Sequence, residues 1–214
     1  MRIINKMHIG GIVLAGGKSR RMEYYDKSLK EINKKTLIGI VYGKARKQVD
    51  LVGINSNTIN KIQYFKNVEF LKDSMPGHLG PLLGILTGIE WLIKKDLNFE
   101  WLATFPVDSP FFPDDLIYKF SSNIKKEKII LAKSGGQIHP VFGMWHVDLY
   151  NDLKQNIFSG IRKIDDFTKN YKLKVVNFEI IEYDPFFNIN NKNDLLKAEK
   201  INKLIKESTN EFCR

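Results

Sequence analysis

The chain has 214 residues, of which 43% are hydrophobic and 27% charged, close to the averages for globular proteins. This composition excludes a largely disordered chain or a fibre, and the length suits one sizeable core in a single domain over residues 1–214. Thirty-four Lys and Arg residues against 24 Asp and Glu give a net charge of +10, which favours polyanionic ligands such as nucleotides or nucleic acid.

The cysteine count and the hydropathy exclude further classes of protein. The single cysteine, Cys213, rules out an internal disulfide and every zinc site built from several cysteines. No apolar stretch approaches the roughly 18 uncharged residues of a membrane span, and the first residues do not follow the pattern of a secretory signal. We therefore expect a cytoplasmic protein without membrane association. Separately, we expect it to be a monomer.

The apolar pattern predicts strands that alternate with helices. In chain order, we expect a strand at 11–15, a helix at 37–47, strands at 50–55 and 68–71, a helix at 81–94, a strand at 101–107, a helix at 113–120, strands at 129–132 and 141–145, and a helix at 193–205. Such alternation is typical of βαβ units. The sequence thus predicts a Rossmann-like three-layer α/β/α fold with a mostly parallel sheet.

Polar side chains follow several of these strands. Ligands of open α/β sheets bind beyond the carboxyl ends of the strands, so residues at those ends are candidates for a site. Gly16, Asn55, Asp73 and Asp108 occupy such positions. Each also suits an ordinary turn, which is the alternative interpretation for Asn55 and Asp73 in particular.

The first strand leads into a loop that combines glycine with basic side chains. Its sequence over Leu14–Met22 is LAGGKSRRM, and Lys27 follows shortly after. Glycine lets backbone amides approach an anion closely, while the basic side chains add charge-assisted contacts to phosphate oxygens. The spacing matches neither the P-loop nor the dinucleotide-binding motif, and a glycine pair alone is also typical of a tight turn. A phosphate site and a plain turn therefore both remain open.

A second candidate is Asp108, which an apolar strand delivers between two prolines, Pro106 and Pro110. A carboxylate in that position suits Mg²⁺, which takes one or two protein carboxylates together with phosphate oxygens and water. The alternative is a turn cap, since Asp before Ser-Pro often begins a turn.

The LAGGKSRRM loop followed by Lys27 resembles the signature of nucleotidyltransferases that activate sugars, alditols and cofactors with nucleoside triphosphates. Within that superfamily the chain is most similar to the molybdenum cofactor guanylyltransferase family. Four further segments carry this resemblance in the family's order: Gly80–Ile85 (GPLLGI), Pro106–Phe111 (PVDSPF), His139–Trp145 (HPVFGMW) and Phe187–Asn190 (FNIN).

The resemblance implies transfer of GMP from GTP to the phosphate of molybdopterin, with Mg²⁺ as the cofactor. Carried over by position, it implies a nucleotide site made of Leu14, Ala15, Gly16, Lys27, Asn55, Asp73 and Asp108. It also implies that Lys27 and Asp108 act in catalysis and that Asp108 holds the metal. Arg21, Asn188 and Asn190 are implied as support for the acceptor or the metal; for the two asparagines, capping of the last helix is the alternative.

Two other functions remain open at this point. The same loop and acid would serve a cytidylyl- or uridylyltransferase that acts on a sugar or alditol phosphate. A basic nucleic-acid-binding protein would instead need clustered basic and aromatic side chains on one surface. The lysines here are scattered, often beside acids, as in Lys125–Lys128 (KKEK), which is typical of a solvated face. We therefore expect no specific nucleic-acid partner.

Overall fold

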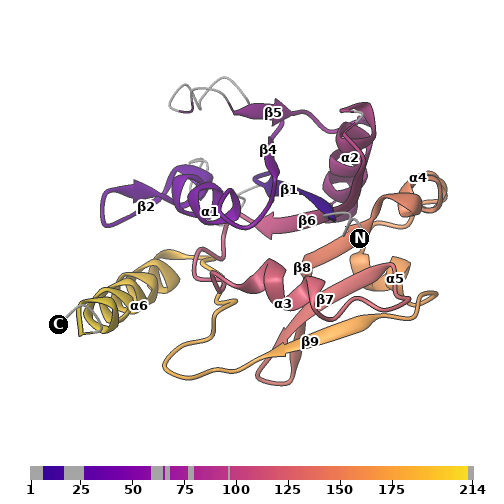
Figure 1. Ribbon diagram of the computed structural model, residues 1–214. Helices are drawn as coiled ribbons and strands as arrows, with labels where there is room; N and C mark the ends of the chain where they lie inside the picture. Colours follow the sequence, from indigo (N-terminus) through magenta and orange to yellow (C-terminus); the bar gives the residue numbers. More distant parts are fainter. Residues whose placement is uncertain are drawn as a thin grey trace.

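A seven-stranded sheet forms the centre of the protein (Figure 1). The computed structural model describes residues 7–16, 27–58, 65, 68–76, 80–95 and 97–211. In spatial order the strands are β5 (Glu69–Leu71), β4 (Leu51–Asn55), β1 (His8–Leu14), β6 (Phe99–Pro106), β8 (Gln137–His146), β7 (Ile129–Ser134) and β9 (Lys174–Phe178).

The sheet is mostly parallel, as expected. The strand β1 pairs in parallel with β4 and β6, and the pairs β4–β5 and β7–β9 are also parallel. Among the described strands of this sheet, only β8 runs antiparallel to its two neighbours, β6 and β7. Its direction follows from the tight turn after β7, where Gly135 and Gly136 adopt φ angles of 53° and 83° that favour glycine.

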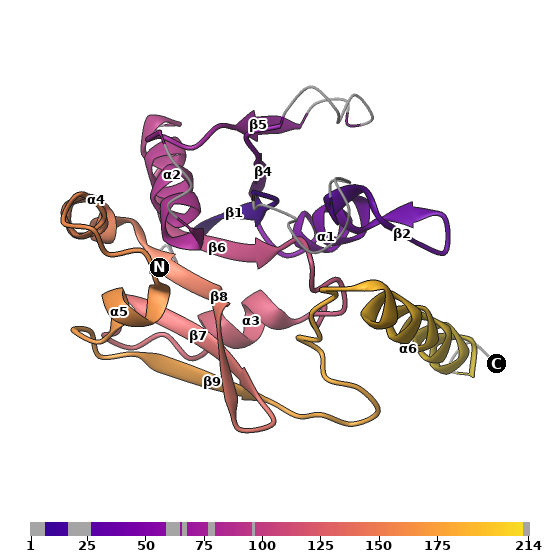
Figure 2. The same ribbon diagram turned by 180° about the vertical axis from the view of Figure 1, so that it is seen from behind.

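Helices cover both faces of the sheet, which confirms the three-layer arrangement (Figures 1 and 2). Apolar side chains of α2 (Pro81–Lys94), α4 (Tyr150–Phe158) and α5 (Ile164–Thr168) pack on one face. Those of α1 (Leu37–Ala45), α3 (Leu116–Ser121) and α6 (Lys192–Glu211) pack on the other. Among the described residues, no helix is both long and apolar enough to cross a bilayer.

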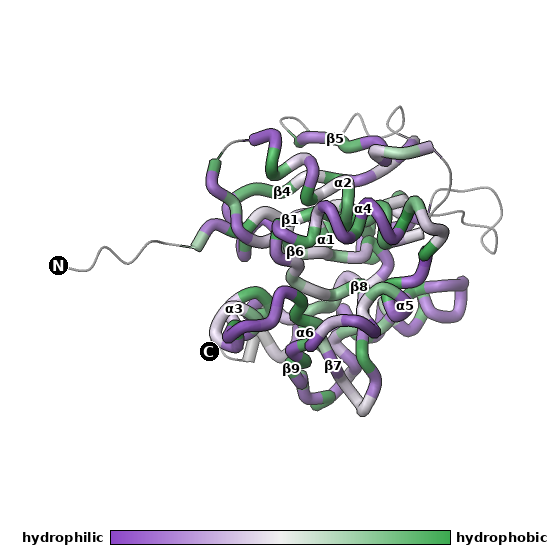
Figure 3. The backbone as a smooth tube through the Cα atoms, turned by 90° about the vertical axis from the view of Figure 1, so that its right-hand side faces the viewer, coloured by the Kyte–Doolittle hydropathy of each residue, from purple (hydrophilic) through white to green (hydrophobic). Residues whose placement is uncertain are grey.

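The alternation of side chains along the strands produces two cores. On β1, Ile12 and Leu14 join the cluster beneath α2, whereas Val13 joins the cluster beneath α1. The hydropathy-coloured backbone shows hydrophobic stretches along β1 and β4, and hydrophobic and hydrophilic residues that alternate along the helices (Figure 3). Both faces of the sheet are thus buried, as a mostly parallel sheet requires.

Several elements were missed or misplaced by the sequence pattern. The hairpin β2 (Glu31–Ile32) and β3 (Lys35–Thr36), the helices α4 and α5, and the edge strand β9 were not predicted. Their apolar positions are few: α4, for example, buries only Leu153 and Ile157. The strand β8 begins at Gln137 rather than at residue 141, because its first half is exposed or half-buried and contains Pro140. The last helix continues to Glu211, beyond the predicted end at residue 205, because residues 206–211 (KESTNE) carry no apolar signal in the sequence.

Candidate active site

Three strand ends meet at one edge of the sheet and form the base of the site. Leu14, the last residue of β1, lies between Asn55 of β4 and Pro106 of β6 in the strand register. The amide of Ala15 donates to the carbonyl of Asn55 at 3.0 Å, and the amide of Val107 donates to the carbonyl of Leu14 at 3.2 Å. These bonds hold the backbone rigidly where the glycine-rich loop leaves the sheet.

The central ion pair of the site joins Lys27 to Asp108. Lys27 begins a short 3₁₀ helix, Lys27–Leu29, and its Nζ lies 2.9 Å from Oδ2 of Asp108. The two side chains are 17% and 29% exposed, so the pair is partly shielded from solvent. The same Nζ donates to Oδ1 of Asn190 at 2.9 Å. Three residues far apart in the chain therefore converge on one cationic centre.

This geometry argues against the turn cap as the role of the Asp108 carboxylate, and the metal site stays a prediction. A turn cap would accept a hydrogen bond from a backbone amide one to three residues further on. Among the described residues, no backbone amide donates to the Asp108 carboxylate, which is instead bound by a lysine 81 residues earlier. Its backbone carbonyl accepts from the amide of Ile189 at 2.9 Å, which attaches the segment containing Asn190 to the site.

Asn188, Asn190 and Asn191, which precede the last helix, make different contacts. Asn188 accepts a hydrogen bond from the hydroxyl of Ser109, beside Asp108, while Asn190 contacts Lys27. Helix capping falls to Asn191, whose Oδ1 accepts from the amide of Asp194 at 2.9 Å, while Oδ2 of Asp194 accepts from the amide of Asn191 at 3.2 Å. The capping interpretation was therefore wrong for Asn188 and Asn190.

A second polar cluster lies at the ends of β4 and β5. The amide group of the buried Asn55 donates to Oδ1 of Asp73 at 2.9 Å and to the carbonyl of Leu71 at 3.3 Å. Asn57 binds Asp73 twice: its Nδ2 donates to Oδ2 at 2.7 Å, and its Oδ1 accepts from the Asp73 amide at 3.0 Å. Asn57 was not predicted as a site residue, although it lies two residues after a predicted strand, as Asp73 does.

Of the two remaining residues predicted from the sequence, the structure describes Gly16 but not Arg21. Gly16 is exposed at the end of β1, next to Asn55. Arg21 lies outside the described residues, as does the rest of the loop over 17–26. The described part of the site thus brings together Leu14, Ala15, Gly16, Lys27, Asn55, Asp73, Asp108 and Asn190 at one sheet edge, with Asn188 just behind it.

The carboxylates of the site suit a metal ion that is shared with a ligand. Among the described residues, no group of three or more His, Cys, Asp or Glu side chains gathers into a cage. Mg²⁺ in phosphate-binding sites needs only one or two carboxylates, because phosphates and water complete its octahedron. Asp108 meets this requirement: Oδ2 is bound by Lys27, and no described residue donates a hydrogen bond to Oδ1.

Helix α2 closes the site from one side through Gly84. A Cβ at this position would lie 2.6 Å from Cδ2 of Leu14 and 3.0 Å from Oδ1 of Asn55, and both of these side chains are buried. Only glycine therefore lets α2 approach the ends of β1 and β4 this closely.

We expect Gly84→Ala to lower the free energy of unfolding by about 1–3 kcal/mol, because the added methyl group overpacks a buried contact. The matched control is Gly43→Ala in α1, where a Cβ would meet nothing within 4 Å. That control should raise the free energy of unfolding by about 0.5–1 kcal/mol, since alanine is the better helix former. Urea denaturation measures both; equal stability of the two variants would contradict the packing described here.

A sheet edge that joins the start of a glycine-rich loop, a lysine and a carboxylate is typical of a nucleotidyltransferase of the α/β class. The chain belongs to the family described as the MobA-like NTP transferase domain, whose model matches residues 11–174. It is similar to the molybdenum cofactor guanylyltransferase of Bradyrhizobium sp. (strain ORS 278), with 35% identity over 196 residues that cover 90% of this chain and 92% of the relative.

Solved structures show the same fold. The structure of molybdopterin-guanine dinucleotide biosynthesis protein A from Archaeoglobus fulgidus superimposes with a TM-score of 0.72 and 23% identity, covering 91% of this chain and 98% of that one. The 4-diphosphocytidyl-2C-methyl-D-erythritol synthase from Anaerococcus prevotii gives a TM-score of 0.69 at 14% identity, covering 92% and 96%. At these identities the likeness concerns the fold alone.

Proposed function

We propose that the chain transfers GMP from GTP to the terminal phosphate of molybdopterin, forming the guanine dinucleotide cofactor and releasing pyrophosphate. The observation that carries the proposal is the Lys27–Asp108 pair at the edge where β1 and β6 end. The curated relatives support the choice of base and acceptor, since they bear the name molybdenum cofactor guanylyltransferase. Neither the cytidylyl- or uridylyltransferase nor the nucleic-acid-binding alternative has comparable support.

The reaction depends more on alignment of the two substrates and neutralisation of their negative charge than on a general base. A phosphate monoester has its second pKa near 6, so at neutral pH an oxygen of the molybdopterin phosphate is already an anionic nucleophile. It attacks the α-phosphorus of GTP; the new P–O bond forms as the bond from the α-phosphorus to the bridging oxygen breaks, and that oxygen leaves with pyrophosphate. The protein must hold two polyanions together and stabilise the charge that develops on the leaving group.

The chain's own residues suit these tasks. The ammonium of Lys27 lies beside Asp108, where it can move onto phosphate oxygens, and the backbone at Ala15 and Gly16 offers amides at the start of the loop. The acceptor-rich cluster of Asp73 suits the N–H groups at N1 and N2 of guanine, a donor pair that adenine lacks. Asn55 and Asn57 hold the Asp73 carboxylate in a fixed orientation for that contact.

MobA-like nucleotidyltransferases generally use a divalent metal ion. We assign Mg²⁺ as that ion and Asp108 as its protein ligand, because a single carboxylate with phosphate oxygens is a typical magnesium donor set. When bound, the ion supplies charge stabilisation at the phosphoryl oxygens. Since Lys27, Asp108 and Asn190 come from one chain, we further propose that the single domain works as a monomer, in the cytoplasm that supplies GTP.

GTP with Mg²⁺ is expected to stabilise the protein more than ATP, CTP or UTP does. A ligand present at one hundred times its dissociation constant adds about 2.7 kcal/mol to the free energy of unfolding. The melting temperature measured with each nucleotide, with and without Mg²⁺, tests this expectation. Equal shifts with all four nucleotides would contradict guanine selectivity. A larger shift with CTP or UTP would favour the cytidylyl- or uridylyltransferase activity instead.

A further inference from the structure

Another hydrogen-bonded group, made of Ser134, His139 and Asp184, lies where β7 ends. It is separate from the residues assigned to the nucleotide. Ser134, the buried last residue of β7, lies with its Oγ 2.7 Å from Nε2 of His139 on β8. The same hydroxyl donates to Oδ1 of Asp184 at 2.7 Å. This oxygen of Asp184 also accepts from the backbone amide of Phe186 at 3.0 Å.

These contacts fix the position of the imidazole proton. Oδ1 of Asp184 accepts two hydrogen bonds, so the single proton of the Ser134 hydroxyl points toward it. The hydroxyl oxygen can then only accept from His139, which places the imidazole proton on Nε2. The other ring nitrogen, Nδ1, is left with a lone pair, and among the described residues no donor binds it.

The surroundings keep this imidazole neutral. Partial burial lowers the pKa of His139 below its usual value, and the negative charge of Asp184 only partly opposes that effect. A neutral imidazole is the predominant form near pH 7. Its Nδ1 is therefore a hydrogen-bond acceptor, suited to a ligand N–H or O–H and not to a phosphate dianion, which has no proton to offer.

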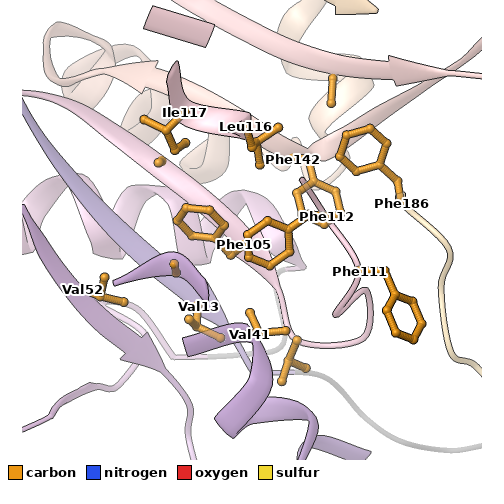
Figure 4. Close-up of a cluster of buried hydrophobic side chains, with 14 of the residues drawn as sticks. Val13, Val41, Val52, Phe105, Phe111, Phe112, Leu116, Ile117, Phe142 and Phe186 are labelled. Atoms are coloured by element: carbon orange, nitrogen blue, oxygen red, sulfur yellow. The ribbon is translucent and has the colours of Figure 1, made fainter. Parts of the chain in front are cut away.

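A short segment of chain connects this group to the reaction centre. Residues 184–190 begin at Asp184, beside His139, and end at Asn190, which contacts Lys27, while Ile189 binds the backbone of Asp108. The ring of Phe186 lies 4.8 Å from that of His139 and 4.8 Å from that of Phe142. In the close-up, Phe186, Phe142, Phe112 and Phe105 form a continuous series of neighbouring rings (Figure 4).

We propose that His139 is a specificity-determining residue that binds the ring system of the acceptor substrate, its Nδ1 accepting a hydrogen bond from a ring N–H or O–H. Ser134 and Asp184 are positioning residues that fix the tautomer and the orientation of the imidazole. This inference rests on the proposed function, in which the acceptor is a pterin phosphate. It orients that acceptor, with the ring at His139 and the phosphate toward Lys27 and Asp108.

Steady-state kinetics of GMP transfer from GTP to molybdopterin tests the proposal. In His139→Ala, we expect the KM for molybdopterin to rise about tenfold, the value of one lost hydrogen bond, while the KM for GTP stays within about twofold. Ser134→Ala should shift the same KM in the same direction, and Ser134→Thr, which keeps the hydroxyl, should restore it. The matched control is His146→Ala, at the opposite end of β8, which should change neither KM.

A second measurement on the unaltered protein does not depend on whether the variants fold. The ¹⁵N chemical shifts of the His139 imidazole should show the proton on Nε2, and the Nδ1 signal should move on addition of molybdopterin but not of GTP. A proton found on Nδ1, or an Nδ1 signal that ignores molybdopterin, would overturn the proposal.

The outcomes separate this inference from the proposed function. If the wild-type protein makes the guanine dinucleotide but His139→Ala keeps the wild-type KM for molybdopterin, only the role of His139 is wrong. If the KM values for both substrates rise together, His139 acts through the fold alone, which also overturns the inference. If the wild-type protein transfers no GMP to molybdopterin, the proposed function fails and the assignment of His139 fails with it.

Discussion

Asp108→Asn is expected to reduce turnover by several orders of magnitude while the fold remains intact. The substitution keeps the shape of the side chain but removes the negative charge that would hold a divalent ion at the triphosphate. Metal-assisted charge stabilisation is worth several kcal/mol, and each 1.36 kcal/mol corresponds to about a factor of ten in rate. Release of pyrophosphate measures the turnover, and thermal unfolding without ligand measures the stability.

The structure also sets the expected change in stability of this variant. Asp108 is paired with Lys27 in a partly exposed position, and Lys27 keeps its contact to Asn190, so loss of the charge should cost about 1 kcal/mol. Asp114→Asn is the matched control, because Asp114 also pairs with a lysine, Lys44, but lies 83% exposed outside the site. If Asp108→Asn were clearly less stable yet fully active, Asp108 would be a structural residue and the assignment of the site would be wrong.

Lys27→Ala should give the second-largest loss, with turnover lowered about 10²- to 10³-fold, the cost of removing one preorganised donor to a developing anion. Binding of GTP should also weaken, since the ammonium is held beside the carboxylate that would share the metal ion with the phosphates. Kinetics at several GTP concentrations separates the two effects.

The control for the lost positive charge is Lys35→Ala, on the exposed hairpin strand β3. It should leave turnover unchanged, because a uniform change in net charge acts weakly at physiological ionic strength. Lys27→Arg should recover only part of the activity, since a guanidinium cannot reproduce the compact contact to both Asp108 and Asn190. Wild-type turnover in Lys27→Ala would show that the lysine only neutralises Asp108.

The sequence predicted which residues lie at the ends of the strands, because those positions depend on local patterns. Apolar runs that end in polar residues marked the ends of β1, β4, β5 and β6, and parallel neighbours in a sheet present those ends at one edge. The placement of Leu14, Asn55 and Asp108 therefore followed once a parallel sheet was expected. Their chemical roles, like those of Asp73 and Lys27, remain predictions for the experiments above.

By itself, then, the sequence determined the class of fold, its first βαβ units and the residues that could meet a nucleotide at the sheet edge. Only the tertiary structure decided the contacts between distant segments: Lys27 with Asn190, 163 residues apart, Ser134 with Asp184, and the reversal of β8. The physical reason is that the sequence pattern and the tertiary contacts carry information over different distances along the chain. Periodicity reports burial over a few neighbouring residues, whereas a side-chain hydrogen bond depends on loop paths that are set only when the helices and sheet pack together.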